Sequence, residues 1–198
     1  HLLTEAAEDP DVISIKMTLY RMARESQIVQ ALIEAAENGK EVVALVELRA
    51  RFDEQNNIDW SKQLEEAGCT ILYGFDDYKV HSKLTLITKK GPQGYSYITQ
   101  IGTGNYNEKT SELYTDYSFI TADLGIGEEA SNVFQNLAVQ KLTETTEKML
   151  VAPLRFKSVL LDEMDRVINA ARLGRPASMI LKNNSISDRD IILKLEAA

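Results

Sequence analysis

The sequence has one cysteine, no long apolar run and no excess of basic residues. No second cysteine is present to complete a disulfide or a metal site with Cys69, and its apolar surroundings predict a buried thiol. No apolar run approaches the roughly 18 residues of a membrane span, and no signal-peptide pattern opens the chain. We therefore expect a cytoplasmic protein without a transmembrane segment.

The balance of charge is acidic, with 22 Lys and Arg against 30 Asp and Glu and a net charge of −8. This balance argues against a chain-wide nucleic-acid surface, which normally carries a basic excess, so we expect no nucleic-acid partner. A pocket for a polyanion needs only a local basic cluster. Candidates for such a cluster lie near the ends of predicted strands, at Arg21, Arg24, Arg49, Arg51, Lys79 and Lys83.

A histidine and a lysine stand at the beginning of an alternating apolar run, at His81 and Lys83. Side chains at positions i and i+2 of a strand share one face, so the imidazole and the ammonium are expected to point the same way. A neutral imidazole nitrogen can attack phosphorus, and a neighbouring ammonium can hold the phosphoryl oxygens. This pair predicts phosphoryl-transfer chemistry, whereas a buried structural histidine would leave Lys83 without a role.

A glycine-rich stretch follows at residues 101–107, with the sequence Ile-Gly-Thr-Gly-Asn-Tyr-Asn. Glycines allow backbone amides to approach an anion, and Asn105 can orient an imidazole or a phosphate oxygen. We expect this stretch and the His81–Lys83 pair to form one site.

Strand and helix patterns alternate along the first three quarters of the chain, which predicts an α/β fold. A strand, a helix and a strand in succession imply a parallel pair, while a turn at residues 91–94 predicts a hairpin, so the sheet is expected to be mixed. Ser26 is expected to cap the first crossover helix, and Ile13 to share the buried face of its strand. The expected strands are 12–20, 41–48, 69–73, 84–90, 95–101 and 115–121, and the helices between and beside them are 2–8, 26–38, 57–68 and 128–140.

Two arginines follow successive strands of the expected parallel pair, at Arg21 and Arg51. In open α/β sheets, ligands bind beyond the carboxyl ends of the strands, and guanidinium groups match phosphate with paired donors. The pair can therefore form an anion clamp, or each arginine can be a surface residue paired with Asp53 or Glu54.

The order of elements restarts near residue 149. The pattern predicts a helix over 154–171, a strand over 177–182 and a last helix from Ser187. One short strand cannot close a sheet, so we expect a second α/β unit of which only the beginning is present.

Several motifs, in this order, closely resemble the long-form bacterial polyphosphate kinase family. They are Tyr20-Arg21, residues 47–54 (Glu-Leu-Arg-Ala-Arg-Phe-Asp-Glu), residues 79–84 (Lys-Val-His-Ser-Lys-Leu), residues 102–107, residues 113–117 and residues 181–184. The resemblance implies a phospholipase-D-like mixed sheet flanked by helices, followed by a truncated second unit. It implies a first catalytic domain at 1–148 and the beginning of a second at 149–198.

The resemblance also implies an activity, which is reversible transfer of the terminal phosphate of ATP to inorganic polyphosphate with Mg²⁺. Residue by residue, His81 matches the phosphorylated histidine, Tyr114 matches a tyrosine that contacts ATP or ADP, and Lys83 and Asn105 match the wider phospholipase-D-like pattern. Arg21 and Arg51 match arginines associated with magnesium. Since a guanidinium has no lone pair for a cation, we expect these two to hold phosphate whose oxygens bind the metal.

The sequence departs from the family pattern before the histidine motif, where residues 74–77 are Gly-Phe-Asp-Asp and add negative charge. The family's site is completed by a second histidine motif, so we expect the chain alone to be inactive. We also expect the full-length protein to be a homo-oligomer. Two alternatives remain. One is a phospholipase-D-like phosphodiesterase or nuclease, although no aspartate shortly follows Lys83, and the other is a non-catalytic module that binds phosphate or nucleotide.

Overall fold

The computed structural model describes residues 1–20, 26–47, 54–144 and 146–198. They divide into two compact units, His1–Leu142 and Thr143–Ala198. Each unit has its own buried side chains, and the two are described separately.

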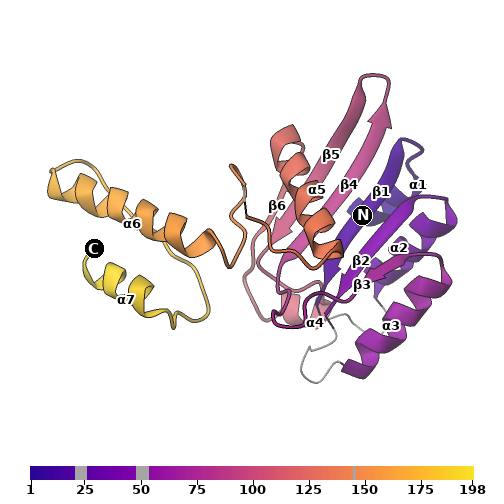
Figure 1. Ribbon diagram of the computed structural model, residues 1–198, viewed down its shortest axis with the longest axis horizontal. Coiled ribbons are helices and arrows are strands. Elements are labelled where there is room, and N and C mark those ends of the chain that lie inside the picture. The colour runs from indigo at the N-terminus through magenta and orange to yellow at the C-terminus, as the bar shows by residue number, and fades with distance from the viewer. Residues whose placement is uncertain (21–25, 48–53, 145) are drawn as a thin grey trace. The chain divides into compact units, whose positions relative to one another are not determined.

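The first unit is built on one six-stranded sheet with the order β3-β2-β1-β4-β5-β6 (Figure 1). Strands β1, β2 and β3 are parallel, and β4, β5 and β6 continue the sheet in antiparallel fashion, so the predicted mixed sheet is confirmed. The strands are β1 (Val12–Leu19), β2 (Glu41–Val46), β3 (Thr70–Leu72), β4 (Lys83–Gly91), β5 (Gly94–Gly102) and β6 (Ser118–Thr121).

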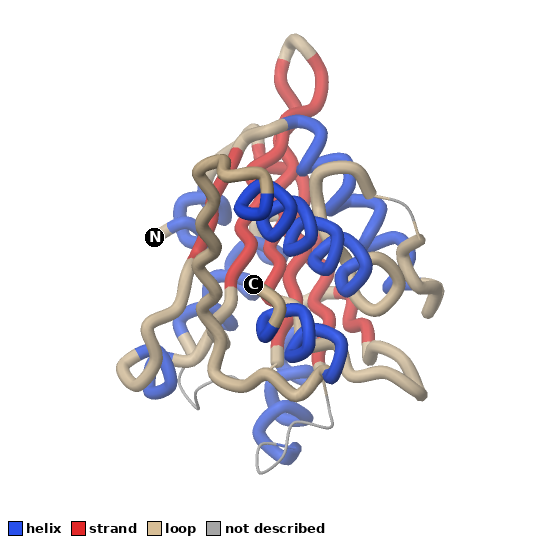
Figure 2. Tube along the Cα trace, turned by 90° about the vertical axis from the view of Figure 1, so that its left-hand side faces the viewer, coloured by secondary structure: helices blue, strands red, loops and turns tan. Residues whose placement is uncertain are grey.

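Helices pack on both faces of this sheet (Figures 1 and 2). The helices α1 (Leu2–Glu8), α2 (Gln27–Glu37) and α3 (Glu54–Glu66) cover β1, β2 and β3, and the short α4 (Glu108–Ser111) lies between β5 and β6 in the chain. The helix α5 (Leu124–Ala138) packs on β4 and β5. The hairpin of β4 and β5 projects beyond the other strands (Figure 2).

The core between the sheet and α1–α3 explains why the sequence pattern predicted these elements well. Apolar side chains from β1 and β2 alternate into it, while α2 contributes one apolar stripe, as a crossover helix must. The buried members include Ile15, Met17, Leu19, Val29, Leu32, Ala35, Val42, Ala44, Val46, Leu64 and Cys69. The predicted burial of the Cys69 thiol is confirmed, and burial raises its pKa to about 11.

Two local predictions in the first unit were wrong. Ile13 is 38% exposed, because the register of β1 against β4 shifts between Val12 and Ser14 and turns the intervening side chain outward. Ser26 occupies the N-cap position of α2, but its side chain makes no capping hydrogen bond, and its buried hydroxyl has no hydrogen-bond partner among the described residues.

Gly127 in α5 lies directly against β5. A Cβ atom added at Gly127 would lie 2.4 Å from Cβ of Tyr97, an atom that side-chain rotation cannot move. Alanine normally stabilises a helix interior over glycine by about 0.5–1 kcal/mol, but overpacking costs about 1–3 kcal/mol. We therefore expect Gly127→Ala to lower the free energy of unfolding in urea by about 1–3 kcal/mol.

Gly91→Ala is the matched control for this substitution, because a Cβ at Gly91 would meet no atom within 4 Å. Its free energy of unfolding should stay within about 0.5 kcal/mol of the wild type. Equal stability of Gly127→Ala and Gly91→Ala would mean that α5 does not pack on β5 as closely as described.

The second unit contains two helices, α6 (Phe156–Arg172) and α7 (Arg189–Glu196). The two helices are in contact, and Met164, Ile168 and Ile191 are buried. Lys194 of α7 forms an ion pair with Asp165 of α6 at 2.7 Å. Asp188 caps α7 by accepting from the amides of residues 190 and 191, so the helix begins two residues after the predicted Ser187.

The predicted strand at residues 177–182 does not form, although these residues belong to the described part of the chain. Ile180 in this segment is 95% exposed. The pattern of apolar residues was suited to a strand, but a strand needs a hydrogen-bonding partner, and no other segment of this unit is extended beside it in a sheet.

Candidate functional site

The His81–Lys83 segment is fixed to the sheet through Thr18 of β1. The Thr18 hydroxyl donates to the carbonyl of Ser82 at 2.8 Å and accepts from the amide of Leu84 at 3.0 Å. Thr18 is itself only 2% exposed. His81 precedes β4 rather than lying in it, and these bonds set the direction in which the chain enters the strand.

Lys83 and His81 come together, as the spacing of the motif predicted. Lys83 Nζ lies 3.1 Å from His81 Nδ1 and donates to the His81 carbonyl at 2.6 Å. The Lys83 side chain is buried, with 4% of the residue exposed, whereas His81 is exposed. Burial lowers the pKa of Lys83 to about 8, and the negative charge of Asp116 partly opposes that shift.

Tyr20, the residue after β1, contacts both members of the pair. Its ring centroid lies 4.7 Å from that of His81, with the planes 77° apart, an edge-to-face arrangement. Lys83 Nζ lies 5.2 Å from the centroid of the same ring, within the range of a cation–π contact. The sequence places Tyr20 at the end of an expected strand and beside Arg21, but it does not indicate this contact.

Glu47 holds the other end of the histidine segment. This residue follows β2, is 4% exposed, and accepts the amide of Val80 through Oε2 at 3.1 Å. The sequence shows Glu47 only as a charged residue at the end of a buried parallel strand. No sequence feature near Glu47 indicates its contact with Val80. The site therefore depends on the carboxyl ends of β1 and β2, as expected for an open α/β sheet.

The glycine-rich stretch packs against Asp116 and Gln100. A Cβ at Gly104 would lie 2.3 Å from Asp116 Oδ2, and one at Gly102 would lie 2.9 Å from Gln100 Nε2 and 3.5 Å from Lys83 Cβ. Neither glycine has a positive φ. Glycine is therefore needed at these positions because a side chain would not fit, and not because of the backbone conformation. Thr103 donates to Asp116 Oδ1 at 2.8 Å, which holds this carboxylate near Lys83.

Asn105 is half-buried, and its buried side-chain oxygen has no hydrogen-bond partner within the part of the chain that the structure describes. Such an acceptor is costly to leave unpaired. This oxygen can therefore accept a hydrogen bond from a bound group, and the predicted role of Asn105 stays a prediction.

Tyr106 anchors the glycine-rich stretch to the sheet behind Lys83. Its hydroxyl donates to Gln100 Oε1 and lies 3.1 Å from the Thr85 hydroxyl, and Gln100 Nε2 donates to Ser118 at 2.9 Å. Burial raises the pKa of Tyr106 to about 12. Three strands and the loop are joined by this polar network.

We expect Tyr106→Phe to lower the free energy of unfolding by about 1–3 kcal/mol, because the buried Gln100 oxygen loses its donor and the buried Thr85 hydroxyl loses its acceptor. Urea unfolding measures this change. Tyr95→Phe is the matched control, since Tyr95 is 57% exposed in the hairpin and should unfold like the wild type. A Tyr106→Phe protein as stable as this control would show that the network contributes nothing to the loop.

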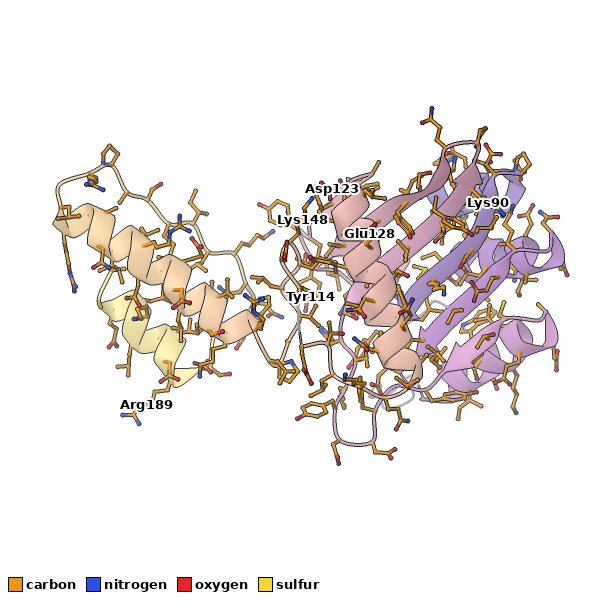
Figure 3. All side chains as sticks on the ribbon, turned by 45° about the horizontal axis from the view of Figure 1, so that its top comes forward. Lys90, Tyr114, Asp123, Glu128, Lys148 and Arg189 are labelled. Atoms are coloured by element: carbon orange, nitrogen blue, oxygen red, sulfur yellow. The ribbon has the colours of Figure 1, made fainter. Side chains whose placement is uncertain are left out.

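Of the remaining predicted site residues, one is described by the structure and two lie outside the described residues. Tyr114, labelled in Figure 3, is 56% exposed in the loop between α4 and β6, where its amide donates to the Thr110 carbonyl at 3.3 Å. Arg21 and Arg51 lie outside the described residues. Within the described part, no group of three or more His, Cys, Asp or Glu side chains is suited to hold a metal ion. No helix in that part is long and apolar enough to cross a membrane.

The six-stranded sheet, with a His-x-Lys segment at the carboxyl ends of its parallel strands, defines a protein of the phospholipase-D-like fold. Two solved structures have this fold at low sequence identity. They are a phospholipase D family member, Nuc from Salmonella typhimurium (TM-score 0.54, 14% identity, 70% of this chain and 84% of that chain), and NucT from Helicobacter pylori (0.55, 16%, 70% and 86%).

The chain belongs to the polyphosphate kinase family. Residues 1–143 match the family domain described as polyphosphate kinase C-terminal domain 1, and residues 149–198 match C-terminal domain 2. The crystal structure of polyphosphate kinase from Porphyromonas gingivalis superposes with a TM-score of 0.86 at 36% identity, over 99% of this chain and 33% of that one.

Curated relatives agree with this assignment. A polyphosphate kinase of Staphylococcus saprophyticus is 46% identical over 193 residues, and one of Lactiplantibacillus plantarum is 44% identical over 194 residues. Both matches cover 98% of this chain and 27% of the relative, so the chain spans about a quarter of the length of these proteins.

Proposed function

We propose that the chain carries part of an enzyme that transfers the terminal phosphate of ATP reversibly to inorganic polyphosphate, through a phosphohistidine at His81. The observation that carries the proposal is the 3.1 Å contact of Lys83 Nζ with His81 Nδ1 in a member of the polyphosphate kinase family. An exposed imidazole beside a buried amine suits a nucleophile that must meet a large anionic substrate.

The reaction takes place in two displacements. A ring nitrogen of His81 attacks the terminal phosphorus of ATP, and the new N–P bond forms as the P–O bond to ADP breaks. The terminal oxygen of polyphosphate then attacks the same phosphorus, the N–P bond breaks, and the imidazole is regenerated. Lys83 places positive charge beside the phosphoryl oxygens, and Asn105 offers its unpaired oxygen to orient a donor in the site.

The nucleotide and the phosphate chain are assigned to further residues. Tyr114 contacts the nucleotide, for which its exposed ring is available, and Arg21 and Arg51 bind phosphate oxygens. The described residues supply no cluster of carboxylates for a metal. In this proposal Mg²⁺ binds together with ATP, with phosphate oxygens as its ligands, and no protein side chain is assigned as a ligand of the ion.

The two compact units correspond in this proposal to a first catalytic domain, residues 1–148, and the beginning of a second, residues 149–198. The match of two family domains to residues 1–143 and 149–198 supports the boundary. The chain spans about a quarter of the length of its curated relatives. We therefore propose that it is inactive alone and acts within a longer protein. We also propose that this longer protein is a homo-oligomer in the cytoplasm, the compartment that supplies ATP.

A second candidate function is hydrolysis of a phosphodiester, which the shared fold with Nuc and NucT favours. A non-catalytic phosphate- or nucleotide-binding module is the third. The carboxylate whose charge acts on Lys83 is that of Asp116, in the loop before β6. Phosphodiesterases of this fold usually have an aspartate shortly after the lysine, so this difference argues against the second candidate.

The test is to incubate a full-length polyphosphate kinase that contains this chain, and the 198-residue chain by itself, with ATP, Mg²⁺ and polyphosphate. We expect polyphosphate to lengthen and ADP to appear only in the reaction that contains the full-length protein, and not in the reaction with the 198-residue chain. A phosphodiester substrate should stay intact in the same reactions. Cleavage of the diester without lengthening of polyphosphate would favour the second candidate, and binding without either reaction would favour the third.

A further inference from the structure

The main-chain pairing of β1 with β4 ends just before the segment that carries the histidine and the lysine. This pairing runs as far as Met17 opposite Thr85 and does not include Thr18. On its other side, β1 stays paired with β2 up to its last residue, Leu19. Toward β4, the next bonds from β1 are made by the side chain of Thr18.

The Thr18 hydroxyl takes the place of the missing strand pairing with two hydrogen bonds. It donates at 2.8 Å to the carbonyl of Ser82, the residue between His81 and Lys83. It also accepts at 3.0 Å from the amide of Leu84, the residue after the lysine. Thr18 is 2% exposed, so water does not compete for these bonds. One buried hydroxyl therefore fixes the main chain on both sides of Lys83.

The main chain before His81 is fixed by a second buried side chain. Glu47 accepts the amide of Val80 at 3.1 Å and is 4% exposed. His81 lies between the Glu47 contact and the Thr18 contacts, and it is itself exposed. An exposed reactive ring is thus carried by a main chain that buried side chains hold before it and after it.

We propose that Thr18 is a positioning residue of the phosphotransfer reaction, whose hydroxyl holds the main chain so that His81 and Lys83 face the same phosphoryl group. The inference rests on the proposed function and adds a residue of β1 that acts only through its neighbours. A displacement of about 1 Å can cost about 10²-fold in rate when two groups must act on one phosphorus. A hydroxyl that bonds two main-chain groups of the segment is suited to prevent such a displacement.

Two substitutions at Thr18 separate the hydroxyl from the packing of the side chain. Thr18→Val keeps the shape and removes the hydroxyl, whereas Thr18→Ser keeps the hydroxyl and removes the methyl group. Thr99→Val is the matched control, because Thr99 in β5 is 0% exposed and its hydroxyl has no hydrogen-bond partner among the residues that the structure describes. All are made in a full-length polyphosphate kinase that contains this chain, and kcat, the KM for ATP and urea unfolding are measured.

We expect Thr18→Val to lower kcat about 10–100-fold and to leave the KM for ATP within about twofold, because alignment is lost and substrate binding is not. Thr18→Ser should keep kcat within about threefold of the wild type, although the loss of a buried methyl group makes it unfold at a lower urea concentration. Thr99→Val should have wild-type kinetics. A hydroxyl with only a structural role would instead make kcat follow stability through all three variants.

Hydrogen exchange tests the same bonds without any measurement of activity. In the peptide that carries Leu84, followed by mass spectrometry, Thr18→Val should lose protection of the Leu84 amide, whereas Thr18→Ser and Thr99→Val should keep it. Unchanged protection in Thr18→Val would overturn the inference, because the hydroxyl would then not hold the segment.

A folded Thr18→Val protein with kcat within about twofold of Thr99→Val would also overturn the inference, while leaving the proposed function intact. If Thr18→Val does not fold, Thr18→Ser decides. Wild-type kcat in Thr18→Ser supports the role of the hydroxyl, and a loss of about tenfold or more in the folded variant would overturn it. A wild-type protein that transfers no phosphate would remove the proposed function, and the inference with it.

Discussion

Replacing His81 by alanine should lower phosphate transfer from ATP to polyphosphate at least ~10³-fold, because the attacking nitrogen is lost and no covalent intermediate can form. His81 is exposed, so the substitution should leave the free energy of unfolding within about 0.5 kcal/mol of the wild type. The measurement is initial rates of ADP formation by the full-length protein, together with urea unfolding of the same preparations.

The matched control is His1→Ala, which removes the other histidine of the chain, also exposed. This variant should transfer phosphate at the wild-type rate. A His81→Ala protein that keeps more than about one hundredth of the wild-type rate would contradict a nucleophilic role, since removing a nucleophile costs far more than that.

Replacing Lys83 by methionine should lower the transfer rate about 10²–10⁴-fold, because the positive charge beside the phosphoryl oxygens is lost. Methionine has a similar length and no charge. The folded protein should not lose stability, since the pKa of Lys83 is lowered to about 8 by burial and the buried ammonium is therefore unfavourable. Loss of activity with retained or increased stability would identify Lys83 as a functional and not a structural residue.

The dependence of stability on pH tests the same buried amine. Between pH about 8 and 10.5 the unfolded state holds the Lys83 proton and the folded state does not, so the free energy of unfolding contributed by Lys83 rises with pH. Each unit of the pKa difference is worth about 1.4 kcal/mol. The raised pKa of Cys69, about 11, acts in the opposite direction as pH rises above 9, so the quantity to compare is wild type minus Lys83→Met.

This difference should grow in favour of the wild type as the pH rises from 8 to 10. A constant difference over that range would mean that Lys83 titrates alike in the folded and unfolded states, and that the amine is not buried as described. Lys16→Met is the control for removing an ammonium, because Lys16 is only partly buried and pairs with Glu41 at 3.6 Å on the surface.

The sequence predicted those parts of the fold whose causes are local. The apolar alternation of β1 and β2 and the apolar stripe of α2 identify a buried crossover, and the turn residues between β4 and β5 identify the hairpin. The helix α5 presents its predicted residues Ala130, Val133, Phe134 and Leu137 to the core for the same reason. Periodicity alone determines which face of such an element is buried.

The same reasoning failed where a structure depends on a partner distant in the chain. Residues 177–182 have the composition of a strand but form no strand in this unit, because hydrogen bonds between strands are not a property of one segment. The spacing of His81 and Lys83 predicted their contact. It could not predict Glu47 at the Val80 amide or Asp116 beside Lys83, since those residues are brought in by the topology of the sheet.

The measurement that tests the central claim most directly is the chemical stability of the phosphate attached to the protein. A full-length polyphosphate kinase that contains this chain is incubated with γ-labelled ATP and Mg²⁺, denatured, and treated with acid or base, alongside its His81→Ala variant. The account predicts a label that acid removes, that base leaves in place, and that the variant lacks. A label stable to acid, or one that persists in the His81→Ala protein, would contradict transfer through His81.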